Sequence, residues 1–184
     1  MLDVRVVFLG GLGEIGRNCA CIEIDGRVLV LDVGLMFPRD DMPGVDLVLP
    51  DFSYLVEVAD RIDGVVLTHG HEDHVGGLAY LLRELDRRLP IYGSALTLGL
   101  AKGRIAEAGM ADRAEMITVD DGERCSIGVF DCQFVPVTHS VPHGFATVIG
   151  TPAGTIVHSG DFKLDLTPVD GRVTDLALLG EVAR

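Results

Sequence analysis

The feature that most constrains this chain is the run Thr68-His69-Gly70-His71-Glu72-Asp73-His74, which sets three histidines and an aspartate at H-x-H-x-D-H spacing. The apolar residues before it, 65–67, predict a buried strand, and residues 75–89 after it predict an amphipathic helix. A loop between a strand and a helix can aim several side chains at one point. Burying these side chains unpaired would cost several kcal/mol, whereas neutral imidazole and ionised carboxylate suit a zinc-like cation. The run therefore predicts a metal site.

Length and composition favour a single globular domain. The chain has 184 residues, of which 48% are hydrophobic and 23% charged, which is ordinary globular usage. No apolar stretch approaches the roughly 20 residues that a membrane-spanning helix needs. The N-terminal residues lack the basic and apolar regions of a secretory signal. We therefore predict a cytoplasmic protein with no membrane partner.

The charge balance is strongly acidic, with a net charge of −13 and a pI of about 4.7. Acidic side chains repel phosphate, so composition alone argues against broad nucleic-acid binding. Bound metal would neutralise part of this charge locally.

The four cysteines are predicted to be reduced thiols with a structural role. They are Cys19, Cys21, Cys125 and Cys132, and none forms a C-x-x-C pair. Cys19 and Cys21 lie two residues apart on a predicted strand, hence on the same face, where they cannot bond to each other comfortably.

The secondary-structure pattern mixes strands and helices along the whole chain. Strands are predicted over residues 4–9, 19–24, 28–31, 65–67, 90–92, 116–119, 125–137, 146–149 and 155–157, and helices over 52–60, 75–89, 94–108 and 174–184. Meanders and hairpins with intervening helices indicate an α/β fold, with layers of sheet and flanking helices. The chain stops within a helical pattern, which we interpret as the N-terminal part of something larger.

The glycine-rich segment 11–16 fits G-x-G-x-x-G and follows a predicted strand, so a dinucleotide site must be considered. That site requires a helix to open at the last glycines and offer its amides to a pyrophosphate. Residues 17–24 instead alternate like a strand and lead into a hairpin. The glycines are better explained by a tight loop near an active site.

Further candidate ligands follow other predicted strands. His139 ends a long apolar strand and would supply another imidazole, and Asp161 follows a buried strand, where a carboxylate can bridge two cations. Asp32 could orient a ligand histidine or cap the following loop. His158 is expected beside the site or in the core, and His143 has no assigned role. The chain has no G-x-S-x-G motif, so covalent catalysis is unsupported.

With these residues assembled, the chain resembles the metallo-β-lactamase superfamily, and within it the N-terminal part of the ribonuclease J family of the β-CASP group. The resemblance covers essentially the whole chain. It rests on residues 8–18 (FLGGLGEIGRN), 43–46 (PGVD), 50–52 (PDF), 68–76 (THGHEDHVG), 137–142 (VTHSVP) and 158–163 (HSGDFK).

The resemblance implies an αββα sandwich, with residues 1–184 forming a partial metallo-β-lactamase-like domain. It implies two zinc ions, with manganese or another divalent ion left open, and cleavage of RNA phosphodiester bonds by a metal-activated water. One zinc would be held by His69, His71 and His139, the second by Asp73 and His74, and Asp161 would bridge them. Asp73 would also orient the water and handle its proton.

The chain departs from the family's pattern in what it lacks. The family's second zinc takes another histidine from far downstream, and the β-CASP insertion and the C-terminal half of the sandwich are absent here. These departures leave two alternatives open. One is a lactamase-fold hydrolase of thioesters or small esters, substrates that the acidic surface would disfavour less than it disfavours RNA. The other is a non-catalytic metal-binding fragment that pairs with a second chain as a homo-oligomer.

Overall fold

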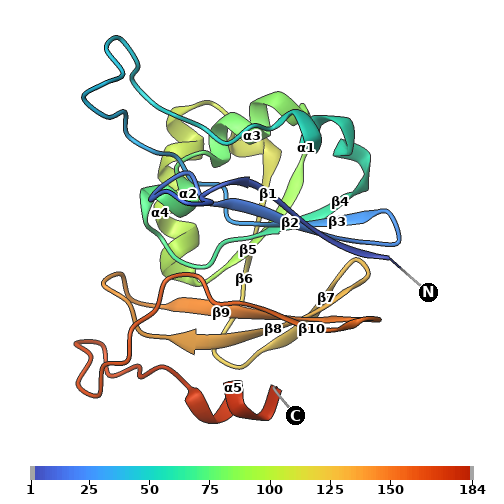
Figure 1. The fold of residues 1–184 in the computed structure, drawn as a ribbon, viewed down its shortest axis with the longest axis vertical. Helices are drawn as coiled ribbons and strands as arrows, with labels where there is room; N and C mark the ends of the chain where they lie inside the picture. Colours follow the sequence, from blue (N-terminus) through green and yellow to red (C-terminus); the bar gives the residue numbers. More distant parts are fainter. Residues whose placement is uncertain (1–2, 183–184) are drawn as a thin grey trace.

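Two β-sheets that face each other form the centre of the computed structural model, which describes residues 3–182 (Figure 1). The first sheet has the spatial order β1-β2-β3-β4-β5-β6, antiparallel from β1 to β3 and parallel from β3 to β6. Its strands are β1 (Val4–Gly10), β2 (Cys19–Ile24), β3 (Arg27–Leu31), β4 (Ile62–Val66), β5 (Leu89–Gly93) and β6 (Ala114–Thr118).

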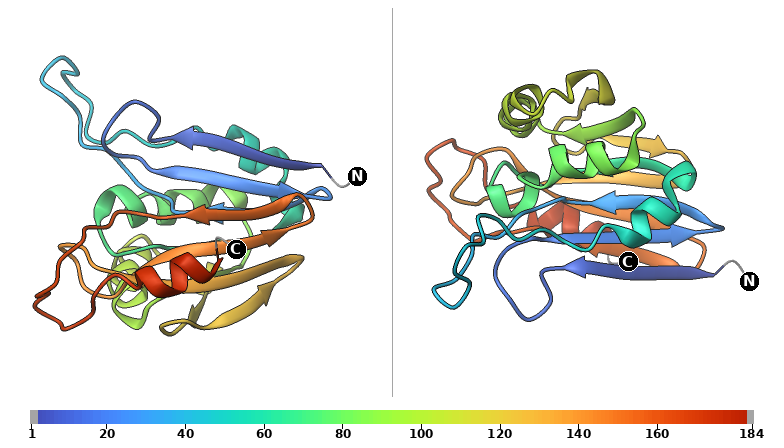
Figure 2. Two further views of the ribbon diagram at one scale, coloured as in Figure 1. Left: turned by 60° about the horizontal axis from the view of Figure 1, so that its bottom comes forward. Right: turned by 90° about the horizontal axis from the view of Figure 1, so that it is seen from above.

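The second sheet is antiparallel and has the order β10-β9-β8-β7. Its strands are β7 (Arg124–Ile127), β8 (Phe130–Val137), β9 (Gly144–Thr151) and β10 (Gly154–His158). Helices α1 (Ser53–Glu57), α2 (Glu72–Val75), α3 (Leu78–Leu85) and α4 (Ala95–Glu107) lie on the outer side of the first sheet, and α5 (Leu176–Val182) lies on the outer side of the second (Figures 1 and 2). Short 3-10 turns, Ala59–Arg61 and Ala111–Arg113, precede β4 and β6.

The alternation of side chains along β3 shows how the layers are held together. Val28 and Val30 pack into the core under the helices, whereas Leu29 and Leu31 pack into the core between the sheets. Successive side chains of a strand point to opposite faces, so a strand covered on both sides reads as a continuous apolar run. A smaller cluster packs α5 against the second sheet. The predicted αββα sandwich is confirmed.

The predicted helix over residues 75–89 is wrong in its extent. A short helix, α2, already begins at Glu72 and ends at Val75, and only α3 (Leu78–Leu85) falls within the predicted range. The break between them arises because the amide of Gly77 donates to the carbonyl of Val33 at 2.8 Å, while the Asp73 carbonyl accepts the amide of Asn18 at 2.9 Å. The helix then ends at Asp86, whose φ of 50° is left-handed, and β5 begins at Leu89.

The predicted strand over residues 125–137 is also wrong in part. It forms two antiparallel strands, β7 and β8, joined by a turn in which Gly128 has a φ of +57°. The predicted α4 is confirmed, because the Ser94 side chain accepts the amide of Thr97 at its start and Gly109, with a φ of +72°, follows its end.

Strand direction brings four loops to one edge of the sandwich. Strands β3 and β4 are parallel, so their carboxyl ends lie side by side. Strands β8 and β10 both run antiparallel to β9, so they also end together. The loops that follow these strands gather on the left in Figure 1. No helix within residues 3–182 is long and apolar enough to cross a membrane.

Candidate metal centre

Most of the predicted ligands meet at this edge of the sandwich. His69 and His71 lie in the loop after β4, His74 lies in α2, His139 follows β8 and Asp161 follows β10. Their donor atoms form two groups, each with all its atoms within 4.8 Å of one another, namely His69, His71 and His139, and His69, His74 and Asp161. His69 belongs to both groups.

Asp161 belongs to the second group and also lies close to a histidine of the first. One of its carboxylate oxygens, Oδ1, is 3.6 Å from Nε2 of His74, and the other, Oδ2, is 3.6 Å from Nε2 of His139. Its side chain is 48% exposed, so solvent and a ligand can reach it. A carboxylate in this position can contact donors of both groups at once.

Asp73 lies at the margin of the cluster and is outside both groups. Its Oδ2 atom is 3.7 Å from Nε2 of His74 and accepts a hydrogen bond from Nδ2 of Asn18 at 3.3 Å. The amide group of Asn18 also lies 3.1 Å from Nε2 of His74. The sequence interpretation missed Asn18, and the signal was its place at the end of the glycine-rich segment predicted to lie near an active site.

That glycine-rich segment connects β1 and β2 as a loop, as predicted, and no helix opens within it. Its end is fastened to the metal-site loops by backbone hydrogen bonds. The amide of Asn18 donates to the carbonyl of Asp73, and its carbonyl accepts the amide of Gly34 at 2.8 Å. The glycines therefore permit a close approach of chain segments rather than a phosphate cradle.

Asp32 is buried beneath the cluster and contacts a histidine rather than capping the loop that follows it. Its Oδ2 atom lies 2.8 Å from Nδ1 of His74 and 3.4 Å from Nε2 of His158, and its Oδ1 accepts the amide of Thr68 at 2.7 Å. The contact with His74 favours the orienting role over the capping role that the sequence also left open, and His158 lies beside the site as expected. His143 is exposed, has a φ of 60° and belongs to neither group.

Burial and neighbouring charge set the protonation of these groups. Burial, with the positive charge of neighbouring His74, lowers the pKa of His69 to about 3. Burial opposes ionisation of Asp32, but His74 and His158 outweigh it and hold the pKa of that carboxyl well below its usual value. Burial lowers the pKa of His74, and the carboxylate of Asp32 more than offsets it, so the net shift is upward.

The donor set fits a divalent cation. A neutral imidazole such as His69 and an ionised carboxylate are the protonation states that a metal ligand requires. Nε2 of His69 and Nδ1 of His71 are 3.0 Å apart, close to the separation of about 3.3 Å between two nitrogens bound tetrahedrally at 2.0–2.1 Å. The residues therefore fit the predicted metal, while the role of each as a ligand stays a prediction.

We expect the metal-free protein to lose stability as the pH falls from 7 to 4. The pKa of His69 is about 3 in the folded chain, against an ordinary value of 6.5, so below pH 6.5 the unfolded chain binds a proton that the folded chain excludes. The loss should reach the order of 2–4 kcal/mol. The raised pKa of His74 acts above pH 6.5 and does not offset it. Urea midpoints measured against pH would test this, and a flat profile between pH 7 and 4 would contradict it.

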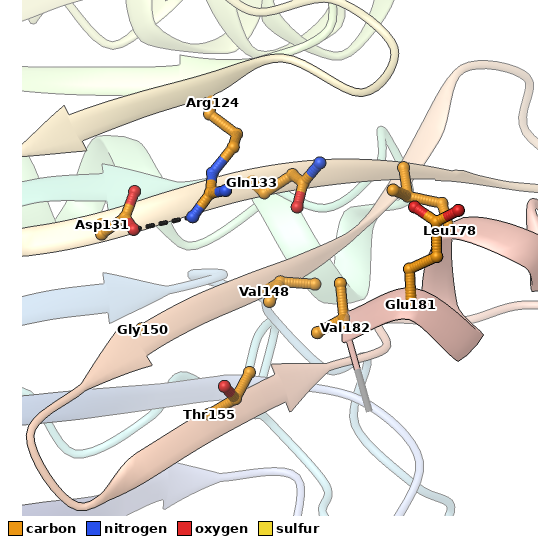
Figure 3. Close-up of a pocket in the computed structure, with 9 residues that line it drawn as sticks. All are labelled: Arg124, Asp131, Gln133, Val148, Gly150, Thr155, Leu178, Glu181 and Val182. Atoms are coloured by element: carbon orange, nitrogen blue, oxygen red, sulfur yellow. Dashed lines mark hydrogen bonds and ion pairs between the residues drawn. The ribbon is translucent and has the colours of Figure 1, made fainter. Parts of the chain in front are cut away.

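A pocket of about 310 Å³ lies elsewhere, between the outer face of the second sheet and α5 (Figure 3). An exposed ion pair lies on one side of the pocket, where Nη2 of Arg124 is 2.9 Å from Oδ2 of Asp131. The other side is lined by three residues of α5, Leu178, Glu181 and Val182. None of the predicted metal ligands lines it, so this pocket is separate from the candidate metal centre.

The cysteines are free thiols, as predicted. Cys19 and Cys21 are buried in the core under the helices, and burial raises the pKa of Cys21 to about 12. A thiol with that pKa is not a nucleophile at neutral pH.

Comparison with known proteins gives both family and fold. A family model described as a β-lactamase superfamily domain matches residues 36–179. Curated relatives named Ribonuclease J are 46% identical in Synechocystis sp., 45% in Thermus thermophilus and 43% in Mycolicibacterium smegmatis, over 94–97% of this chain. The chain spans only 28–32% of the length of these relatives.

Solved structures share the fold at low sequence identity. A protein of unknown function from Enterococcus faecalis aligns with a TM-score of 0.66 and 20% identity, over 89% of this chain and 44% of that one. A zinc-bound PqqB from Methylobacterium extorquens aligns with a TM-score of 0.61 and 18% identity, over 84% of this chain and 64% of that one. At these identities the likeness supports the fold alone.

Proposed function

The chain belongs to the β-lactamase superfamily, and we propose that it is a zinc-dependent hydrolase that cleaves RNA phosphodiester bonds. The observation that carries the proposal is the pair of donor groups beyond the carboxyl ends of β4, β8 and β10, with His69 common to both and Asp161 of the second group 3.6 Å from a histidine of each. The similarity to curated ribonucleases J over nearly the whole chain supports RNA as the substrate class. Acting on RNA is thus proposed for this chain, which spans less than a third of those relatives.

We assign each predicted ligand to one of two cations or to both. His69, His71 and His139 would hold one cation, Asp73 and His74 a second, and Asp161 would contact both. Bound cations would polarise a phosphoryl oxygen, lower the pKa of a water molecule and stabilise the leaving oxygen.

Asp73 is our candidate for handling the proton of the attacking water. Its carboxylate is 29% exposed, so it can meet solvent, and its Oδ2 atom accepts a hydrogen bond from the amide of Asn18. That bond leaves lone pairs on the carboxylate free to take a proton. Asn18 therefore would orient the base while its backbone amide holds the Asp73 carbonyl.

The acidic charge of −13 favours the alternative of a small-molecule esterase or thioesterase, because such substrates need no phosphate-binding surface. The same cations would activate water for attack on a carbonyl. Turnover of a thioester without cleavage of RNA would favour this alternative.

The test is metal content per chain by elemental analysis, measured together with cleavage of a 5′-phosphorylated RNA. We expect two metal ions per chain and RNA cleavage that is lost on chelation and restored by zinc. Manganese in the same assay tests the choice of metal. One ion or none, without cleavage, would contradict the proposal and favour a non-catalytic fragment. Sedimentation of the same sample tests the predicted homo-oligomer.

A further inference from the structure

Thr68 is buried between the ionised carboxylate of Asp32 and two histidines of the donor groups. Its Oγ1 atom lies 2.9 Å from Oδ2 of Asp32 and 3.1 Å from Nδ1 of His69. The same hydroxyl lies 3.4 Å from Nδ1 of His74, and the side chain is 0% exposed. No role is yet given to it by the proposed chemistry, although it immediately precedes a predicted ligand.

The single hydroxyl proton of Thr68 decides how these groups bond. An ionised carboxylate can only accept hydrogen bonds, and hydrogen bonds to charged acceptors are about twice as strong as those between neutral groups. The proton of Thr68 therefore goes to Oδ2 of Asp32. What Thr68 then presents to Nδ1 of His69 is a lone pair, and Nδ1 must supply the proton of that bond.

We propose that Thr68 is a positioning residue that fixes His69 as its Nδ1–H tautomer, leaving the lone pair on Nε2 for a metal ion. Nε2 is the nitrogen that faces His71, at 3.0 Å from its Nδ1 atom. The purpose of this tautomer rests on the proposed metal-binding function, whereas the position of the proton on His69 does not depend on it. The tautomer of a metal-binding histidine is set by the bond that its other nitrogen makes.

One carboxylate would in this way orient two imidazoles. Asp32 contacts Nδ1 of His74 directly at 2.8 Å, and it acts on His69 through the Thr68 hydroxyl. Both rings then carry their proton on Nδ1 and turn Nε2 toward the cluster. A carboxylate that directly follows β3 can in this way act on both groups of donors that share His69.

The first measurement needs no variant. In metal-free protein labelled with ¹⁵N-histidine at pH 7.5, long-range ¹H–¹⁵N correlation spectra distinguish a protonated ring nitrogen from an unprotonated one. We expect His69 to show a protonated Nδ1 and an unprotonated Nε2. A protonated Nε2 on His69 would overturn the proposal, whether or not any variant folds.

Two substitutions at Thr68 distinguish the effect of its hydroxyl group from the effect of its side-chain shape. Thr68→Val keeps the branched shape that packs against Gly160, at which an added Cβ would lie 2.8 Å from Cβ of Thr68. We expect His69 to change to Nε2–H in this variant, because Nδ1 of His71 is its remaining partner, and metal affinity to fall about 10–100-fold. Thr68→Ser should restore both. Unchanged Nδ1–H in Thr68→Val would overturn the proposal.

Thr138→Val is the matched control. Thr138 is also a buried threonine directly before a predicted ligand, His139, but its hydroxyl donates to the carbonyl of Arg172 at 2.7 Å. Its loss should therefore leave the His69 tautomer unchanged, and an equal change in this variant would count against a specific role for Thr68. If the tautomer behaves as expected while no metal binds, the proposed function fails and the proton arrangement stands.

Discussion

His69→Ala is expected to abolish metal-dependent hydrolysis and to lower the metal content of the protein, because His69 is one of the three ligands proposed for the first cation and its ring also lies beside the second donor group. His69 is the one residue common to the two donor groups, so its removal deprives each of an imidazole. Asp161→Ala should have a similar effect, because its two oxygens lie 3.6 Å from a histidine of each group. Since changing a supporting residue alone costs 10–100-fold in metal affinity or activity, losing a ligand should lower the rate more than about 100-fold.

Initial rates of RNA cleavage and elemental analysis of the same preparations would test this expectation. His143→Ala is the matched control, since this histidine is exposed and belongs to neither group; it should keep its metal. A denaturation curve for each variant separates lost ligation from lost folding. Unchanged activity in His69→Ala or in Asp161→Ala would end the assignment.

The layers of the fold could be predicted from the sequence because their signal is local. The continuous apolar run of β3 and the residues that flank α4, Ser94 and Gly109, are visible within a short window of the sequence. Of the two wrong predictions, the strand over 125–137 overlooked a local turn at Gly128, whereas the helix over 75–89 failed because a distant contact replaced a local one. The helix after the histidine run breaks because Gly77 donates to Val33, on another segment, instead of continuing the helix. Nothing between residues 75 and 89 alone indicates that partner.

The residues of the candidate site likewise fall into those that the local sequence predicts and those that depend on distant contacts. The H-x-H-x-D-H spacing lies within one loop and could be read directly, whereas Asp32, Thr68 and Asn18 acquire their contacts only through strand pairing. The role of Asp32 was left undecided because its partner His74 is 42 residues away in sequence. Parallel pairing of β3 with β4 brings them together. The acidic composition likewise does not indicate which carboxylates lie at the candidate site.

Gly34→Ala is expected to unfold the site, with a loss of at least about 3 kcal/mol in the free energy of unfolding. Gly34 is buried just after β3, and a Cβ added there would lie 1.6 Å from the carbonyl oxygen of Asp73 and 2.8 Å from the amide nitrogen of Asn18. Both are backbone atoms, so no side chain can rotate away. The segment carrying Asp73 and His74 would have to move, and metal content should fall with stability.

Gly99→Ala makes the same substitution where its effect should have the opposite sign. Gly99 is exposed within α4, and a Cβ added there meets no heavy atom within 4 Å. Replacing a helical glycine by alanine should stabilise the protein by about 0.5–1 kcal/mol. Urea denaturation of both variants therefore distinguishes the close approach at Gly34 from a general effect of adding a methyl group. A Gly34→Ala protein with wild-type stability and metal content would show that the metal-site loop is not held by that approach.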